Sequence, residues 1–427
     1  MSGVQLLVPE LLREILLRLP WGVGQKFHVA QVSRYWRDVA LHYPLFWSSF
    51  WATHNNRLTI VLERSDTTML HIELFLVTSP DTDWPGKALA ALLPHVARIE
   101  RLDIQLTGGL DDSHPLSPEP LLHSNLEFPS LKTLRLMGDT DAARILLKAP
   151  QLQILDLEYC DPEDLDALLS PGLENIRLYD PRIKSVGTLF RISTRCPRAW
   201  RVVLLDGTGE EPQFGSFVVQ QPFAPALREL EIVSMASVDI TYILTTWLSD
   251  VVLHTLTTRF DCFDPHLEHV IPASLRGVGP LVIFDDLDDE HPFLEVGDES
   301  GHIRRFRNTD EQPTLGGFRK TVETSILPLQ SAQNYIDFKI DYMVPTDASL
   351  SDVNRNMSKP MRIAGLAKVK FFGPRAYLRV ATVTHVLAHI EPPAGSQVEV
   401  TGPWVEKSTE AKDPQTPEYL VSPCQAQ

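Results

Sequence analysis

The histidines of the C-terminal half are the side chains whose spacing could hold a metal ion. His266 and His269 stand three residues apart, and His385, His389 and Glu391 lie close together. Structural and catalytic zinc sites use at least three protein ligands of this kind. Neither group has a further ligand nearby in the sequence, so we expect ordinary histidines and no metal site.

The sequence contains no motif that would carry catalysis or hold a cofactor. It lacks GxSxG, the phosphate-binding GxxxxGK[ST], GxGxxG and HExxH. The acidic run DDLDDE, residues 285–290, lacks the glycine and the spaced glutamate of a calcium loop, which favours an exposed acidic loop. We therefore expect a non-catalytic protein without a cofactor.

The cysteine of the C-terminal CQAQ has a position that could allow prenylation. Cys424 fits the C-a-a-X frame, with the type of final residue used for farnesylation. Gln425 is not aliphatic, however, and no polybasic run precedes the motif to supply a second membrane signal. We expect Cys424 to be unmodified and the protein to have no membrane partner.

Composition and charge narrow the class of partner. The formal net charge is −16, with 39 basic against 55 acidic residues, which argues against sequence-independent nucleic-acid binding. The four cysteines are far apart, which is typical of a reducing compartment. No apolar run is long enough to span a membrane, so the cytoplasm, the nucleus or both are expected.

The N-terminal fifty residues have the pattern of three short helices. Pro9 and Glu10 suit a first helical turn, and leucines and isoleucines follow at helical spacing up to Leu19. A second helix is expected over about 25–31, and a third after the cap residue Ser33, ending at Pro44. So small a bundle cannot bury all its apolar and aromatic side chains, which indicates an interface.

These residues resemble an F-box. The resemblance rests on VPELLREILLRL, VAQVSRYWRDVA and PLFW, in this order over residues 7–47. The chain departs from the family at Val8, where leucine is usual, and at Gly22, Val23 and Gly24, where acidic loop residues are more common.

The resemblance implies docking onto the Skp-type adaptor of a cullin-RING ubiquitin ligase. Its adaptor-facing positions fall on Pro9, Glu10, Ile15, Leu16, Leu19, Val32, Ser33 and Trp36. Tyr43, Phe46 and Trp47 are expected to join the module to the next domain. The alternative is that these residues only pack the bundle or join it to the rest of the chain.

Beyond the helical module, a short apolar pattern recurs. Segments of the form L-x-x-L/I-x-L begin at residues 131, 152 and 173, related segments begin at 200, 227 and 253, and a similar frame fits residue 99. Weaker copies begin at 335 and 366, and helix-like stretches lie between several of them. Intervals of 20 to 29 residues are typical of leucine-rich repeats.

The predicted fold class is α/β. A three-helix F-box module over residues 1–52 precedes an irregular leucine-rich-repeat solenoid over 53–405, and a disordered, proline-rich tail covers 406–427. The solenoid would be a curved parallel sheet with helices on its outer side. The resemblance extends to fungal F-box proteins with divergent repeats.

Side chains that flank the central residue of each predicted strand should form the concave face. The candidate substrate-binding residues are Arg135, Asp156, Arg177, Leu204 and Glu231. A solvated sheet face without a partner is the alternative for each of them.

The preferred interpretation is the substrate-recognition subunit of an SCF-type ubiquitin ligase. It would bind the adaptor, and through it the cullin, and present an unknown protein substrate, acting through proximity rather than covalent chemistry. One alternative is a repeat scaffold that binds the adaptor or other proteins without ubiquitination. Another is an enzyme whose active site lies in residues 275–405, although no catalytic motif supports it.

Overall fold

The computed structural model describes the chain in two compact units. The first comprises Met1–Thr208 with Val219–Leu227, and the second Gly209–Val218 with Arg228–Gln427. Within them the structure describes residues 7–18, 22–53, 57–77, 84–107, 126–138, 147–158, 165–179, 185–205, 226–233, 243, 253–260, 281–286, 293–297, 302–308, 334–341, 366–372 and 397–401. The proline-rich tail, Cys424 and the histidine groups lie outside these residues.

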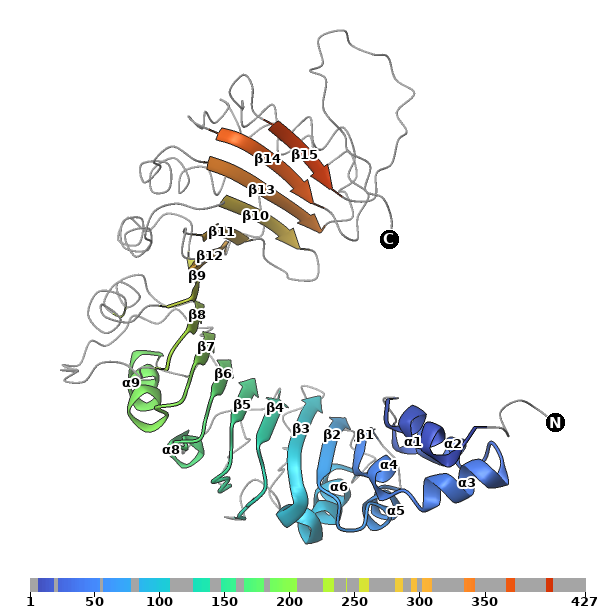
Figure 1. Ribbon diagram of the computed structural model, residues 1–427. Helices are drawn as coiled ribbons and strands as arrows, with labels where there is room; N and C mark the ends of the chain where they lie inside the picture. Colours follow the sequence, from blue (N-terminus) through green and yellow to red (C-terminus); the bar gives the residue numbers. More distant parts are fainter. Residues whose placement is uncertain are drawn as a thin grey trace, which may run out of the picture. The chain divides into compact units, whose positions relative to one another are not determined.

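Four helices form an N-terminal helical head: α1 (Pro9–Arg18), α2 (Val23–Val29), α3 (Arg34–Leu41) and α4 (Pro44–Ser48) (Figure 1). Pro9 begins α1 as expected, and the Ser33 side chain caps α3 by accepting from the Trp36 amide at 3.1 Å. The third helix ends at Leu41, three residues before the expected end at Pro44. That proline begins α4, because its fixed φ suits a first helical position.

A parallel sheet of seven strands follows the head in the first unit: β1 (Ser49–Ala52), β2 (Leu70–Val77), β3 (Ile99–Thr107), β4 (Thr133–Gly138), β5 (Ile154–Glu158), β6 (Asn175–Tyr179) and β7 (Arg201–Leu205). Each strand pairs with the next in the chain, always in parallel. The recurring apolar frames thus form strands, as predicted. β1 falls inside residues 1–52, which were expected to form the helical module.

The helices of the sheet region lie along one side of the strands (Figure 1). They are α5 (Leu58–Arg64), α6 (Trp84–Leu92), the short 3₁₀ helix η2 (Leu93–Arg98), α8 (Leu165–Leu168) and α9 (Ser185–Arg195). Their buried residues, such as Leu89, Leu168 and Leu189, join the strand leucines in one core. Burial alternates along β4, β5 and β6, so one sheet face is apolar and the other carries the polar side chains.

The second unit contains β8 (Glu229–Val233), β9 (Thr255–Phe260), β10 (Leu281–Asp286), β11 (Phe293–Gly297), β12 (Ile303–Asn308), β13 (Asn334–Asp341), β14 (Leu366–Phe372) and β15 (Gln397–Thr401). The prediction of a wholly parallel sheet is wrong here, because β11 pairs antiparallel with both β10 and β12. The remaining pairs of this unit are parallel. Antiparallel neighbours can be joined by short hairpin connections, whereas the predicted repeats assume a longer crossover between parallel strands.

The predicted orientation of one strand is also wrong. Arg177 on β6 pairs with Val203 on β7, so Leu204 points to the apolar face and is only 2% exposed. Leu204 is therefore a core residue and not a surface contact. The predicted frame was anchored on Trp200, whereas the buried first position of this repeat is Ala199. A shift of one residue moves every side chain of a strand to the other face.

Candidate functional site

The outward surface of the helical head carries exposed apolar side chains. Val8, Leu11 and Ile15 lie three and four residues apart, which places them on one side of α1. The Tyr35 hydroxyl donates to the Leu7 carbonyl at 2.7 Å and so holds the start of α3 beside the start of α1. Val32, just before α3, is 60% exposed. We call Val8, Leu11, Ile15 and Val32 the apolar head surface.

The residues expected to face an adaptor differ in their accessibility. Pro9 and Glu10 are exposed, while Ser33 and Trp36 are half-buried. Trp36 keeps a buried Nε1–H without an acceptor among the described residues. Leu19 lies outside these residues.

Leu16 does not belong to the surface of the head. It is 1% exposed and packs with Leu12 in the core, because the inner side of α1 carries Leu12 and Leu16 four residues apart. Its assignment as a direct adaptor contact is contradicted. Ile15, the next residue toward the N-terminus, is exposed instead.

Aromatic residues of α4 pack where the head meets the sheet. Trp47 is fully buried, donates from Nε1 to the Ala40 carbonyl at 2.7 Å and contacts the Phe27 ring edge-on at 5.5 Å between centroids. The Arg64 guanidinium of α5 lies 4.6 Å from the Trp47 ring centroid, which joins the head to the first helix beyond it.

The other two residues expected at this junction have different environments. Phe46 is buried beside Trp47, with ring centroids 5.0 Å apart. Tyr43 is half-buried and lies under the Arg13 guanidinium at 5.4 Å, so it contacts α1 within the head. Burial raises the pKa of Tyr43.

A glycine allows the closest approach of head and sheet. Gly22 forms a β-bridge with Trp51 of β1, and a Cβ at Gly22 would lie 2.6 Å from the Trp51 ring. Any larger residue would push the two apart. The glycine that departs from the F-box pattern is therefore required by this contact.

Lys26 of α2 is a buried cation at the same junction. Its ammonium donates to the Phe46 carbonyl and lies 4.3 Å from the Phe46 ring centroid. No carboxylate pairs with it within the described residues, and burial lowers its pKa from 10.5 to about 7. Part of the Lys26 population is therefore neutral near pH 7.

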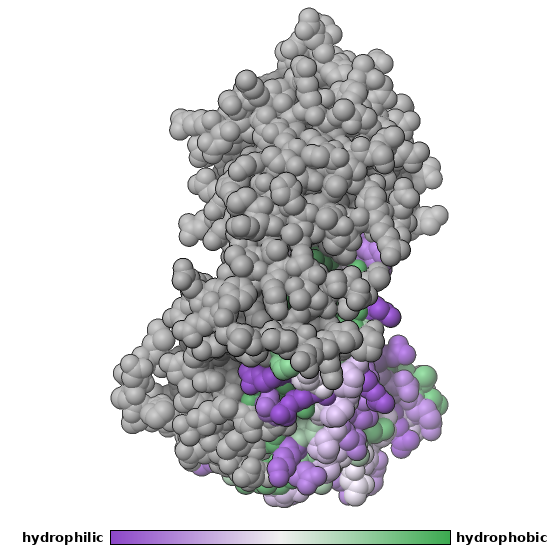
Figure 2. All heavy atoms as spheres, turned by 90° about the vertical axis from the view of Figure 1, so that its left-hand side faces the viewer, coloured by the Kyte–Doolittle hydropathy of each residue, from purple (hydrophilic) through white to green (hydrophobic). Residues whose placement is uncertain are grey.

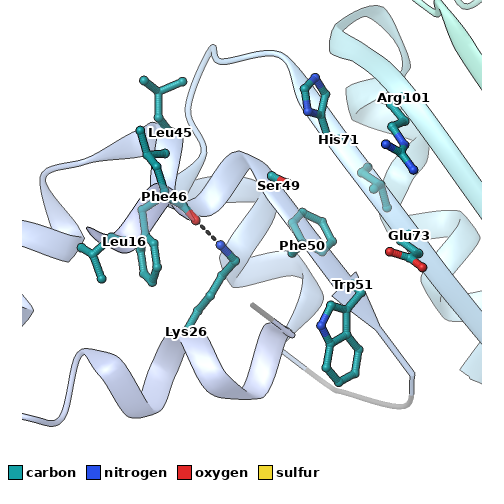
Figure 3. A pocket seen from close by; sticks show the side chains of 12 residues that line it. Leu16, Lys26, Leu45, Phe46, Ser49, Phe50, Trp51, His71, Glu73 and Arg101 are labelled. Carbon is teal, nitrogen blue, oxygen red and sulfur yellow. Dashed lines mark hydrogen bonds between the residues drawn. The ribbon is translucent and has the colours of Figure 1, made fainter. Parts of the chain in front are cut away.

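A cavity of about 180 Å³ opens beside Lys26. Figure 3 shows Leu16, Leu45 and Phe46 of the head on one side, and His71, Glu73 and Arg101 of the strands on the other. The two sides differ in polarity, since the helical side is apolar apart from Lys26 and the strand side carries His71, Glu73 and Arg101.

The polar face of the sheet carries a row of charges across neighbouring strands. In register from β2 to β6, the row is Glu73, Asp103, Arg135, Asp156 and Arg177. Arg135 Nε lies 3.4 Å from Asp156 Oδ2, and Arg177 Nε lies 3.9 Å from Asp156 Oδ1. The structure thus brings three of the predicted substrate-binding residues together.

Arg101 adds a further cation next to this row. It donates from Nε and Nη2 to Asp103 Oδ2, at 3.1 and 2.6 Å. We call the sheet face formed by Arg101, Asp103, Arg135, Asp156 and Arg177 the arginine face.

Arginines extend from this face while its carboxylates are recessed. The side chains of Arg101, Arg135 and Arg177 are about half exposed, whereas Asp103 is only 5% exposed. Asp156 is also mostly covered, and burial raises its pKa more than the arginines beside it lower it. Figure 2 shows hydrophilic side chains over much of the visible described surface, with hydrophobic ones between them.

Glu231 and Cys196 lie apart from the arginine face. Glu231 lies on β8 of the second unit, in register with Thr257 of β9. No group of three metal-ligating side chains occurs within the described ranges. Burial raises the pKa of the Cys196 thiol to about 12, which makes it a poor nucleophile.

Sequence reasoning missed Lys26, Arg101 and Asp103. The frame at residue 99 already placed Arg101 and Asp103 on the outward side of a strand, next to Arg135. Lys26 follows Val23 by three residues and precedes Val29 by three, a spacing that places it on the buried side of α2.

Comparison of the chain with models of known protein families, with curated proteins and with solved structures finds no match. Among the described residues, no helix has the length and apolar character needed to cross a membrane.

Proposed function

We propose that the protein is the substrate-recognition subunit of an SCF-type ubiquitin ligase. Its helical head would be an F-box that binds a Skp-type adaptor and through it a cullin. The strands beyond would be divergent leucine-rich repeats that bind a protein substrate. The protein would act by holding the substrate near the ubiquitin-carrying enzyme, which raises the effective concentration of the reacting lysine.

The apolar head surface is the observation that carries this proposal. Val8, Leu11, Ile15 and Val32 are exposed in this chain, although Leu12 and Leu16 beside them are buried. Apolar side chains grouped on one small helical surface favour a protein partner. They fall within the same stretch of residues, 7–47, that resembles an F-box.

The revised contact set follows from accessibility. Ile15, Val32, Pro9 and Glu10 remain as direct contacts of the adaptor, and the exposed Val8 and Leu11 join them. Leu16 and Ser33 would shape the surface from below, Leu16 as core and Ser33 as the cap of α3. Trp36, which is half-buried, would be covered fully by the adaptor.

Co-purification of the full chain with a Skp-type adaptor tests the proposal. We expect a stable complex that Ile15→Glu disrupts, because a charge replaces an exposed apolar contact. Ile60→Glu on α5 is the matched control, since Ile60 and Ile15 are both 39% exposed. A wild-type chain that retains no adaptor, or equal binding by both variants, would reject the F-box assignment.

A further inference from the structure

We infer that the arginine face binds an acidic segment of a partner protein. The inference depends on the proposed function only in treating that partner as the ligase substrate. The surface is formed by Arg101, Arg135 and Arg177 over Asp103 and Asp156, and the ion pairs that hold these residues together are all made within the sheet.

The first argument is the direction in which the charges are displayed. A ligand that approaches this face meets guanidinium groups first, because the two aspartates lie beneath them. Within the part of the chain that the structure describes, the guanidiniums of Arg135 and Arg177 are held by ion pairs from Nε to Asp156, at 3.4 and 3.9 Å. These pairs use Nε, so the Nη groups are left for carboxylate or phosphate oxygens, which guanidinium binds with two parallel hydrogen bonds.

The second argument is that stability does not explain the cluster. Asp103 Oδ1 is buried without a hydrogen-bond partner among the described residues. An unsatisfied buried polar atom is costly, and ion pairs with half-exposed arginines return little. The recessed aspartates instead hold the arginines in place, as supporting residues do around a binding site.

The third argument is charge complementarity. Glu100 is already paired with Lys132 at 2.6 Å and with His71 at 3.3 Å, and these pairings lower the pKa of Glu100. Glu73 and Glu158 are half-buried on the same sheet face. The face also holds Asp103 and Asp156, so its arginines do not outnumber its carboxylates, but its outermost ionisable side chains are basic: His71, Arg101, Arg135 and Arg177.

The spacing of the arginines suggests the form of the ligand. Arg135 and Arg177 lie two strands apart, which corresponds to about 9.6 Å between their backbones. A polyproline-II segment advances about 9.3 Å over three residues and returns to the same side. Acidic residues three positions apart in an extended peptide would therefore lie over the two strands that carry these arginines.

Fluorescence anisotropy of the full chain tests this inference without any adaptor. The probe is a fluorescein-labelled peptide of about ten residues, with glutamate at every third position between serines and prolines. Companion peptides carry phosphoserine or lysine at those positions. We expect the glutamate or the phosphoserine peptide to bind and the lysine peptide not to bind. The acidic peptide with the higher affinity identifies whether the face prefers carboxylate or phosphate.

Charge reversal localises the binding. Arg135→Glu with Arg177→Glu should weaken the acidic peptide at least tenfold. The matched control is Arg191→Glu with Arg195→Glu, because these two arginines of α9 flank Asp166 as Arg135 and Arg177 flank Asp156. Circular dichroism checks that both double variants fold.

Two results would overturn the inference. One is equal affinity of the acidic and lysine peptides, or no binding of either. The other is an equal loss of binding in the two double variants. Neither result bears on the adaptor, so a failure here leaves the F-box proposal standing, and a failure of adaptor binding leaves the arginine face standing.

Discussion

The apolar head surface and the arginine face offer opposite chemistry to a partner. The head exposes Leu11 and Ile15, while its buried Lys26 faces inward. The sheet exposes arginines while its aspartates are recessed beneath them. One surface favours association by apolar burial, which salt affects little, and the other favours electrostatic association, which salt weakens. Under the two proposals, the difference assigns a separate ligand to each surface.

Replacement of Trp47 should have the largest effect and tests whether the two surfaces depend on one another. Trp47→Ala removes a fully buried ring and its hydrogen bond to Ala40, which should lower the free energy of unfolding by about 3–5 kcal/mol. Urea denaturation measures the change.

Trp200→Ala is the control, because Trp200 is 38% exposed and should cost much less. Equal losses would contradict the burial of Trp47. If the Trp47 variant loses adaptor binding but retains peptide binding, the two surfaces are independent.

Lys26 makes the stability of the head depend on pH. Its folded pKa of about 7 lies below the ordinary 10.5, so the unfolded chain binds more protons between these values. The contribution of Lys26 to stability therefore rises with pH from about 7 to 10.5.

Lys26→Met should remove this rise. We expect the stability of the variant relative to wild type to be higher at pH 6 than at pH 9 by roughly 2–3 kcal/mol, because about two pH units of this interval lie above the folded pKa. Urea denaturation at both pH values gives the comparison. The same advantage at both values would show that Lys26 does not titrate in this range.

Salt should separate the two surfaces directly. Raising sodium chloride from 50 to 500 mM should weaken acidic-peptide binding about tenfold or more, since exposed arginines are screened. Adaptor binding should change less than about twofold, because apolar contacts carry it. Titrations of both ligands in both buffers measure the effect, and a similar salt response would remove the distinction between the surfaces.

Asp156 should give the smallest change. Burial raises its pKa, so the charged form is disfavoured in the folded protein and its contribution to stability falls as pH rises through that pKa. Asp156→Asn should stabilise the protein slightly at pH 7, by less than about 1 kcal/mol, with no gain in strong acid. Thermal denaturation at two pH values measures it, and a loss of stability at pH 7 would mean that its ion pairs dominate.

Much of the local structure was predictable because its signals are local. Pro9 and Ser33 identified the starts of two helices, and the leucine frames identified the strands. At β7 the frame failed because Val202, Val203 and Leu204 are all apolar, so alternation could not fix the register. The prediction therefore assigned Trp200 to the buried first position of this repeat, which Ala199 occupies in the structure.

The sites were less predictable, because they depend on packing between elements. Leu11 and Leu12 look equivalent in sequence, yet only Leu12 is buried against the rest of the head. From the sequence, Asp103 and Asp156 are expected to be exposed. In the structure arginines on neighbouring strands cover them, and this depends on the register between the strands. The antiparallel pairs of β11 depend on connections that the apolar frame does not encode.

The most direct test of the central claim is the affinity of the full chain for a purified Skp-type adaptor, measured by isothermal titration calorimetry. We expect a dissociation constant below about 1 μM for wild type, about −8 kcal/mol of binding free energy. Leu11→Glu with Ile15→Glu should weaken it at least thirtyfold, whereas Ile60→Glu should leave it unchanged. No detectable binding by the folded wild-type chain would contradict the proposal.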